Sequence, residues 1–197
     1  MPKPTIASPS LVKRALEQGV LSRVEKPARY IGGEYGSLSP KEGAECRVAL
    51  AFPDLYEVGM SHLGLRILYS LANSVPGASC ERVFAPALDM ASEMKREGIP
   101  LYALESFSPL SDFSILGFSL EYELCLTNVL YMLDLARLPL LAKDRKESDP
   151  IVIAGGPCCV NPEPFRDYFD AIFVGEAEES LPRALRERIL SSRSGEG

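Results

Sequence analysis

The sequence lacks the features that would mark a membrane, nucleotide-binding or hydrolytic protein. None of its apolar runs is long enough to span a bilayer, and its first residues contain no apolar signal-peptide core. We therefore expect a cytoplasmic protein with no membrane partner. The phosphate loop GxxxxGK(S/T), the dinucleotide fingerprint GxGxxG and a Ser-His-Asp order are also missing. A net charge of −6 argues against direct binding of this chain to nucleic acid.

Cysteine is too scattered for a metal centre. An odd number of cysteines in a chain without a secretory signal fits reduced thiols. The adjacent pair Cys158-Cys159 leaves a redox pair or a soft-metal site open. Neighbouring side chains on extended backbone point in opposite directions, however, which favours one packed thiol and one at the rim of a crevice. The five cysteines are Cys46, Cys80, Cys125, Cys158 and Cys159, and no CxxC or CxxxCxxC pattern joins them. We therefore predict that the chain has no metal ligands, and we assign no catalytic residue to it.

Apolar segments alternate between a strand-like and a helix-like pattern from residue 46 onward. Continuous apolar runs are typical of parallel strands that are buried on both faces. Between them, apolar residues recur with the 3.6-residue period of a helix. This alternation predicts an α/β fold with a doubly wound, mostly parallel sheet, Rossmann-like or flavodoxin-like. We expect strands at 47–53, 80–84, 101–104, 115–119, 150–154 and 171–174, and helices at 62–73, 88–96, 124–136 and 178–190.

The chain divides into three parts at this level. Residues 1–44 are predicted to be an irregular extension with a short helix at 10–18, capped by Ser10, and with loop or one edge strand around 29–36. Residues 45–178 form the α/β domain. Residues 179–197 form a C-terminal helix and a linker that begins near residue 191.

The strand ends point to one ligand site. The fifth strand runs into Gly155, Gly156 and Pro157, the fourth into Ser119, and the sixth into Gly175-Glu176. Glycines leave the backbone uncovered by Cβ atoms, so a large ligand can approach it closely. Because ligands of open α/β sheets bind at the carboxyl ends of the strands, these residues predict a crevice at that edge.

Several polar residues at this edge have two interpretations. Ser119 is either a hydrogen-bond donor to a ligand or the N-cap of the next helix. His62, the only histidine, starts a helix at the crevice, but no paired carboxylate or second ligand supports a metal or acid–base role. Glu178 and Glu179 are best explained as acids that complement a helix macrodipole, which leaves Gly175 as the better candidate for ligand approach.

Four segments together resemble a known family. Residues 53–65, 116–120, 152–157 and 173–178 are similar to the N-terminal cobalamin-binding domain of radical S-adenosylmethionine (radical SAM) proteins. The similarity extends over about residues 28–190 and is strongest to the B12-binding radical SAM subgroup of unassigned substrate. It implies a cobalamin-binding type of fold, with the corrin ring over the carboxyl edge of the sheet. The residues implied to bind the cofactor are Tyr56, Ser61, His62, Gly64, Ser119, Gly155, Gly156, Pro157, Gly175 and Glu176.

The resemblance also implies that the cofactor is bound in one domain and that the reaction takes place in another. The 4Fe-4S cluster and S-adenosylmethionine would belong to a downstream radical SAM barrel, the partner of this module, where methyl transfer or radical rearrangement would take place. The Asp-x-His-x-x-Gly motif of cobalamin domains is absent, because Asp54 and His62 stand eight residues apart. The resemblance therefore assigns no protein ligand to cobalt. Two alternatives are a flavodoxin-like nucleotide or small-molecule binder and a degenerate docking domain without cofactor.

Overall fold

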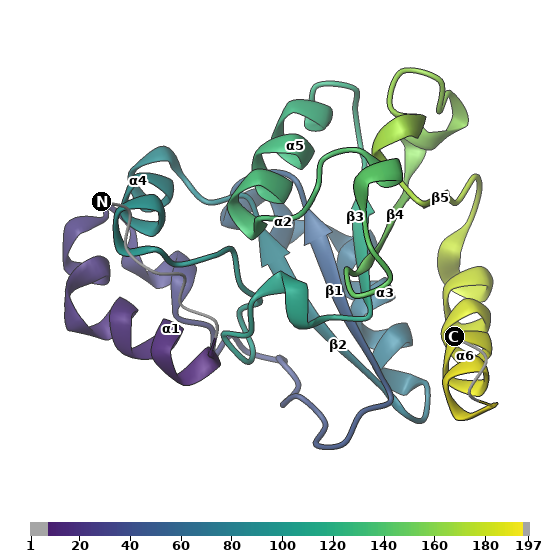
Figure 1. The fold of residues 1–197 in the computed structure, drawn as a ribbon, viewed down its shortest axis with the longest axis horizontal. Coiled ribbons are helices and arrows are strands. Elements are labelled where there is room, and N and C mark those ends of the chain that lie inside the picture. The colour runs from purple at the N-terminus through teal and green to yellow at the C-terminus, as the bar shows by residue number, and fades with distance from the viewer. Residues whose placement is uncertain (1–7, 195–197) are drawn as a thin grey trace.

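One parallel sheet organises the molecule. The computed structural model describes residues 8–194, and these form a five-stranded sheet with the order β2-β1-β3-β4-β5, in which every neighbouring pair is parallel (Figure 1). The predicted doubly wound α/β fold is thereby confirmed. The strands are β1 (Cys46–Phe52), β2 (Ala78–Phe84), β3 (Ile115–Ser119), β4 (Ile151–Gly155) and β5 (Ala171–Ile172).

The order of the strands fixes where a crevice can form. The chain goes from β1 outward to β2 and then returns to place β3 on the other side of β1. The direction of winding therefore changes between β1 and β3, and the connections that follow these two strands diverge. In flavodoxin-like sheets of this order, that point is where ligands bind.

Helices cover the sheet. α3 and α6 pack against each other and both contact β1, while α4 and α5 contact each other. α3 buries Leu65, Tyr69 and Ala72, which are spaced by four and three residues and so lie on one face of the helix. The helices are α1 (Pro9–Ala15), α2 (Tyr56–Ser61), α3 (Leu63–Ser74), α4 (Leu88–Glu97), α5 (Cys125–Ala136) and α6 (Ala177–Ser194).

The two terminal helices lie at opposite ends of the long axis of the molecule (Figure 1). α1 continues into a π-helical turn, η1 (Leu16–Val20), and together they bury Val12, Leu16 and Val20 on the side of α4. At the other end, α6 buries Leu181, Leu185 and Ile189. Short 3-10 turns complete the structure at η2 (Leu21–Arg23), η3 (Pro27–Tyr30), η4 (Leu110–Asp112), η5 (Ala142–Asp144), η6 (Pro157–Val160) and η7 (Arg166–Tyr168).

The predicted strand at 101–104 is not a strand. Its residues are engaged by three different partners: Leu101 N–H donates to Leu135, Ala103 N–H to Ser108, and Leu104 N–H to Arg82. In these residues, the one β-type pairing is an isolated antiparallel bridge between Tyr102 and Pro109. The segment therefore covers the edge of β2 as a loop.

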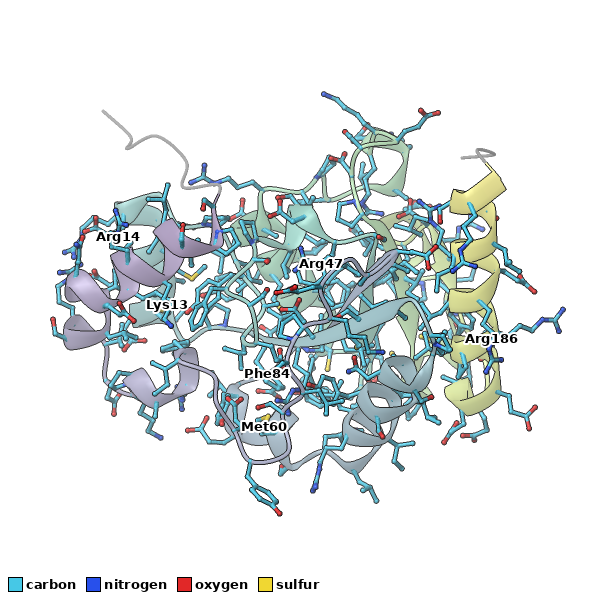
Figure 2. All side chains as sticks on the ribbon, turned by 90° about the horizontal axis from the view of Figure 1, so that it is seen from below. Lys13, Arg14, Arg47, Met60, Phe84 and Arg186 are labelled. Atoms are coloured by element: carbon cyan, nitrogen blue, oxygen red, sulfur yellow. The ribbon has the colours of Figure 1, made fainter. Side chains whose placement is uncertain are left out.

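Buried charges fasten this loop to the sheet. The Arg47 guanidinium, in the middle of the molecule in Figure 2, lies 2.9 Å from the fully buried Glu81 carboxylate, which also accepts the Ser106 N–H at 3.0 Å. Glu105 accepts from both the backbone N–H and the Nε of Arg82, at 2.8 and 2.7 Å. These four charged side chains replace the regular strand pairing that the sequence suggested.

The ends of the chain also differ from prediction. Ser10 is not the N-cap of the first helix, because the helix begins one residue before it and Ser8 holds the cap position. Residues 29–36 form no edge strand; a 3-10 turn and irregular backbone occupy that region. Residues 191–194, expected in a linker, belong to α6, and the rest of the predicted linker (195–197) lies outside the described residues, as do residues 1–7.

Candidate functional site

A cleft of about 470 Å³ lies at the carboxyl ends of β3 and β4, under the N-terminal ends of α3 and α6. Its floor contains Leu50, Gly117 and Ile153, which are aligned across β1, β3 and β4. Because Gly117 has no side chain, the floor is lowest at its centre. A Cβ atom there would lie 3.4 Å from Leu50 Cδ2 and 3.5 Å from Ile153 Cγ1. Further apolar lining comes from Leu65, Leu68, Phe118, Ala154, Val160, Phe173, Ala177 and Leu181.

Glycines form part of the rim, as the sequence predicted. Gly64, Gly155, Gly156 and Gly175 line the cleft together with Pro157. A Cβ atom on Gly155 would make only an ordinary contact, 3.8 Å from Phe173 Cβ, and one on Gly175 would meet no atom within 4 Å. The backbone at these two positions is therefore open to whatever fills the cleft.

Gly156 has a different role from Gly155. Its φ of 110° lies in a region that L side chains rarely adopt, and an added Cβ would be 2.6 Å from the Leu120 carbonyl oxygen. Leu120 also donates its N–H to Gly155 and accepts the N–H of Cys158. Gly156 thus allows the loops that follow β3 and β4 to join closely beneath the rim.

Ser119 does not cap the following helix. The N-cap position of α5 belongs to Leu124, and the Ser119 hydroxyl instead donates to Oε1 of Glu121 at 2.7 Å. Glu121 lines the cleft and its side chain is 21% exposed. Sequence reasoning missed this glutamate, although its position two residues after Ser119 in the same strand-end loop was a usable signal.

His62 is held at both ring nitrogens. Its Nδ1 accepts the backbone N–H of Leu65 at 3.2 Å and so caps α3, while Nε2 lies 3.4 Å from Oε2 of Glu121. The imidazole also packs against Phe52, with 5.0 Å between ring centroids. A ring nitrogen that accepts an N–H carries no proton, so the neutral imidazole of His62 has its proton on Nε2, the nitrogen that faces Glu121.

The charge of the rim is negative. Glu121, Glu176 and Glu178 line the cleft, and no lysine or arginine does so among residues 8–194. Glu178 and Glu179 stand in the first turn of α6, as predicted, where they complement the positive end of its macrodipole. An anion in the cleft would therefore meet three carboxylates and, among the described residues, no lysine or arginine.

Two residues implied by the resemblance lie elsewhere. Tyr56 packs edge-on against Phe84, with 5.5 Å between ring centroids, and Phe84 lies well away from α6 in Figure 2. The Ser61 hydroxyl donates to the Val58 carbonyl within α2, a helix that the sequence suggested would be loop. The structure does not bring either side chain to the cleft.

The cysteine pair stands in the η6 turn behind the rim, not in the extended backbone expected from the sequence. Cys159 is buried and Cys158 is half-buried. Burial raises the pKa of both thiols, that of Cys159 to about 11. No group of three or more His, Cys, Asp or Glu side chains is placed to hold a metal ion in the part of the chain that the structure describes.

A second hollow, of about 490 Å³, lies beside Asp54 and the start of α4. Its polar side chains are already engaged with the protein. Tyr122 donates to Asp54 Oδ2 at 2.7 Å, Asn128 to the Pro53 carbonyl and Tyr131 to the Pro86 carbonyl. These bonds hold neighbouring loops together, so the glycine-rimmed cleft is the better candidate site.

Exposed apolar side chains occur on the connections at the carboxyl edge of the sheet, where the cleft also lies. The connections that follow each of the five strands carry at least one of them, and their exposed fractions reach 79%. Exposed large apolar side chains on several connections at one edge make that edge a candidate interaction surface. Its members are Leu63, Leu88, Tyr122, Leu124, Val160 and Val174.

The fold and the cleft define a class of protein: a flavodoxin-like α/β domain with an apolar, glycine-rimmed cleft at the carboxyl edge of its sheet. The sequence model of the family described as radical SAM proteins, N-terminal, matches residues 64–195, about two thirds of the chain. The chain belongs to this family, which confirms the radical SAM part of the resemblance. No curated protein and no solved structure matches the chain. Across residues 8–194, no helix is both long and apolar enough to cross a bilayer.

Proposed function

We propose that this chain is a cobalamin-binding module of a radical SAM protein and that the cleft above Gly117 holds the corrin ring. The observation that carries the proposal is the cleft floor, where an apolar surface lacks a side chain at its centre. A flat macrocycle needs such a surface, and it also needs backbone at the rim that no Cβ covers. Gly117, Gly155 and Gly175 meet both needs.

The residues fit a corrinoid that receives no imidazole from the protein. His62, the only histidine, uses Nδ1 to cap α3 and directs Nε2 toward Glu121. Cobalt ligation through Nε2 would require the proton to move to Nδ1, where it would face the Leu65 N–H. The apolar floor of the cleft would therefore contact the face of the ring, and the rim of the cleft would contact the edge of the ring.

When bound, a corrinoid supplies methyl-transfer or radical chemistry at its cobalt. This chain's own residues would bind and orient the ring and keep one face dry. A radical SAM barrel with a 4Fe-4S cluster and S-adenosylmethionine is the partner we propose. The exposed apolar side chains at all five strand ends support a partner that covers this edge.

Two other functions are less well supported. A flavodoxin-like site for a nucleotide would place phosphate beside Glu121, Glu176 and Glu178 without a lysine or arginine among the described lining residues. A docking domain without cofactor would not need an open floor at Gly117.

Reconstitution with hydroxocobalamin tests the proposal. The protein is incubated with the cofactor, separated by gel filtration, and the bound corrinoid is measured by absorbance; we expect about one per chain. Gly117→Val fills the floor and should reduce affinity by about tenfold or more, at roughly 1.4 kcal/mol per tenfold change. Ser70→Val adds the same side chain to the exposed side of α3 and should change nothing.

Three outcomes are distinct. Stoichiometric binding that Gly117→Val weakens at an unchanged urea midpoint supports the proposal. A bound flavin in place of corrinoid would establish the flavodoxin-like alternative. Binding of neither cofactor would leave the docking domain.

A further inference from the structure

We infer that Glu121 is the residue that selects the ligand of the cleft, and that the ligand meets it with N–H donors, as carboxamides or a cation, rather than with phosphate or carboxylate. This inference deepens the proposed function and rests on it for the identity of the ring. The preference for N–H donors stands on the geometry of the cleft itself.

The backbone before Glu121 is fixed on both sides. Leu120 donates its N–H to the Gly155 carbonyl at 2.7 Å, and its carbonyl accepts the Cys158 N–H at 3.1 Å. Gly156 packs directly against the same peptide. The residue that follows Leu120 is therefore presented at the rim by a rigid junction of two strand-end loops.

The Glu121 carboxylate accepts a hydrogen bond from Ser119 and faces His62, which belongs to another element. Ser119 Oγ donates to Oε1 at 2.7 Å, and His62 Nε2 lies 3.4 Å from Oε2. A carboxylate offers about four acceptor positions, so positions beyond the one that Ser119 occupies remain for a ligand. Because this side chain lines the cleft and is 21% exposed, those positions are accessible from the cleft.

His62 reinforces this preference. With Nδ1 engaged by the Leu65 N–H, the neutral imidazole has no free lone pair to offer to a ligand. Ser119 uses its hydroxyl proton on Glu121. The three side chains together thus present a carboxylate acceptor to the cleft.

The charges around the cleft also disfavour an anionic ligand. Like charges in close contact repel each other at the effective dielectric of a protein surface, so an anion beside Glu121 would be strongly disfavoured. The N-termini of α3 and α6 both face the cleft and would attract an anion. At α3, however, His62 Nδ1 already accepts the Leu65 N–H, and at α6 the first-turn residues Glu178 and Glu179 offset the dipole.

Two corrinoids with the same ring test the inference. Cobinamide carries carboxamide side chains and no nucleotide phosphate, whereas cobyrinic acid carries carboxylates in their place. We expect the unmodified protein to bind cobinamide about 10- to 100-fold more tightly, the range of one or two hydrogen bonds to a charged group. Glu121→Gln should reduce that ratio by about tenfold. Glu123→Gln removes the same charge two residues away, outside the residues that line the cleft, and should leave the ratio unchanged.

Equal binding of the two corrinoids, or equal effects of the two glutamine variants, would overturn the inference. If neither corrinoid binds, the proposed function fails, and riboflavin and flavin mononucleotide then decide the inference, because they share a ring and differ by one phosphate. Riboflavin binding that exceeds that of the mononucleotide, with a ratio that depends on Glu121, would support it. Equal or stronger binding of the mononucleotide, or binding of neither flavin, would overturn it.

Discussion

Gly156 approaches Leu120 so closely that a Cβ atom would lie 2.6 Å from the Leu120 carbonyl oxygen and 3.0 Å from its nitrogen. Neither atom can move away, because both belong to backbone that is hydrogen-bonded to the β4 side of the junction. With φ 110° and ψ 175°, Gly156 also has a conformation that only glycine adopts readily. The second glycine of the Gly-Gly-Pro motif therefore serves the fold, and the first serves the cleft.

Substitution at these two glycines should have different effects on stability. Gly156→Ala should lower the free energy of unfolding by roughly 1–3 kcal/mol or more, because it adds backbone strain and a clash with Leu120. Gly155→Ala should change it by less than about 1 kcal/mol, since its Cβ meets only Phe173 Cβ at 3.8 Å. Urea unfolding followed by circular dichroism measures both. Equal urea midpoints for the two variants would contradict this assignment.

His62 should matter for the stability of α3 and not for ligation of cobalt. His62→Ala removes an N-cap and should cost about 1 kcal/mol, whereas His62→Asn restores a good capping side chain and should recover most of that loss. Both variants should still bind cobinamide, because Ser119 continues to hold Glu121 and no ligand of cobalt is lost.

Electron paramagnetic resonance separates the two roles of His62. Cob(II)inamide carries no base of its own, so nitrogen superhyperfine splitting in its bound state would have to come from the protein. We expect none. Splitting that is present in the unmodified protein and lost in His62→Asn would make His62 the lower ligand.

The sequence was most informative where local pattern and tertiary partners agree. The run at 115–119 was predicted with its observed bounds because a short continuous apolar segment between polar residues is typical of a buried strand. The segment 101–104 has a similar pattern, but its N–H groups bond to Leu135, Ser108 and Arg82, which are distant or irregular partners. The local sequence of this segment does not indicate which groups its N–H groups bond to, so the loop could not be predicted from it.

The cleft shows the same limit. Gly155, Gly156 and Gly175 could be found because glycine at the end of a strand has a local meaning, whereas Gly64 was named only through the family resemblance. Glu121 was missed because its importance depends on two partners, Ser119 in the same loop and His62 on another element. Gly117 was a readable signal that was not used, since an isolated glycine inside a strand marks a close approach.

The buried pair of Arg82 and Glu105 predicts a pH-dependent response to mutation. Both side chains are about 5% exposed or less, and burial is the largest effect on the pKa of Glu105, which it raises, while Arg82 lowers it. Because this pKa is raised above the unfolded value near 4.5, the folded state is favoured by protonation of Glu105. That contribution is fully present below pH 4.5 and is lost as the pH rises through the folded pKa.

Arg82→Met should therefore destabilise the protein most at neutral pH. It leaves Glu105 buried without its cation, which should cost about 3–5 kcal/mol at pH 7.5. The pKa of Glu105 should rise further, so the loss should shrink as the pH is lowered toward 5. Arg82→Met combined with Glu105→Gln should recover part of the stability at pH 7.5 and show a flatter pH profile. A loss that is independent of pH would contradict the assignment of the effect to Glu105.

The adjacent cysteines provide a final prediction, because their thiols differ in burial. Cys159 is fully buried and its pKa is raised to about 11, chiefly by burial, whereas Cys158 is half-buried. A shift of two units from the ordinary value of 9.0 lowers the thiolate fraction at pH 8 about 100-fold, and thiolate is the reactive form. Iodoacetamide should therefore modify Cys158 before Cys159 in the folded protein. Peptide mapping by mass spectrometry at pH 7, 8 and 9 follows both sites, with the urea-unfolded protein as the reference in which the two rates become similar. The reaction at Cys159 should accelerate with pH throughout this range, since the pH stays below its raised pKa. Modification of folded Cys159 at the unfolded rate at pH 8 would show that the thiol is exposed and activated, and would restore the redox-pair interpretation of these two residues.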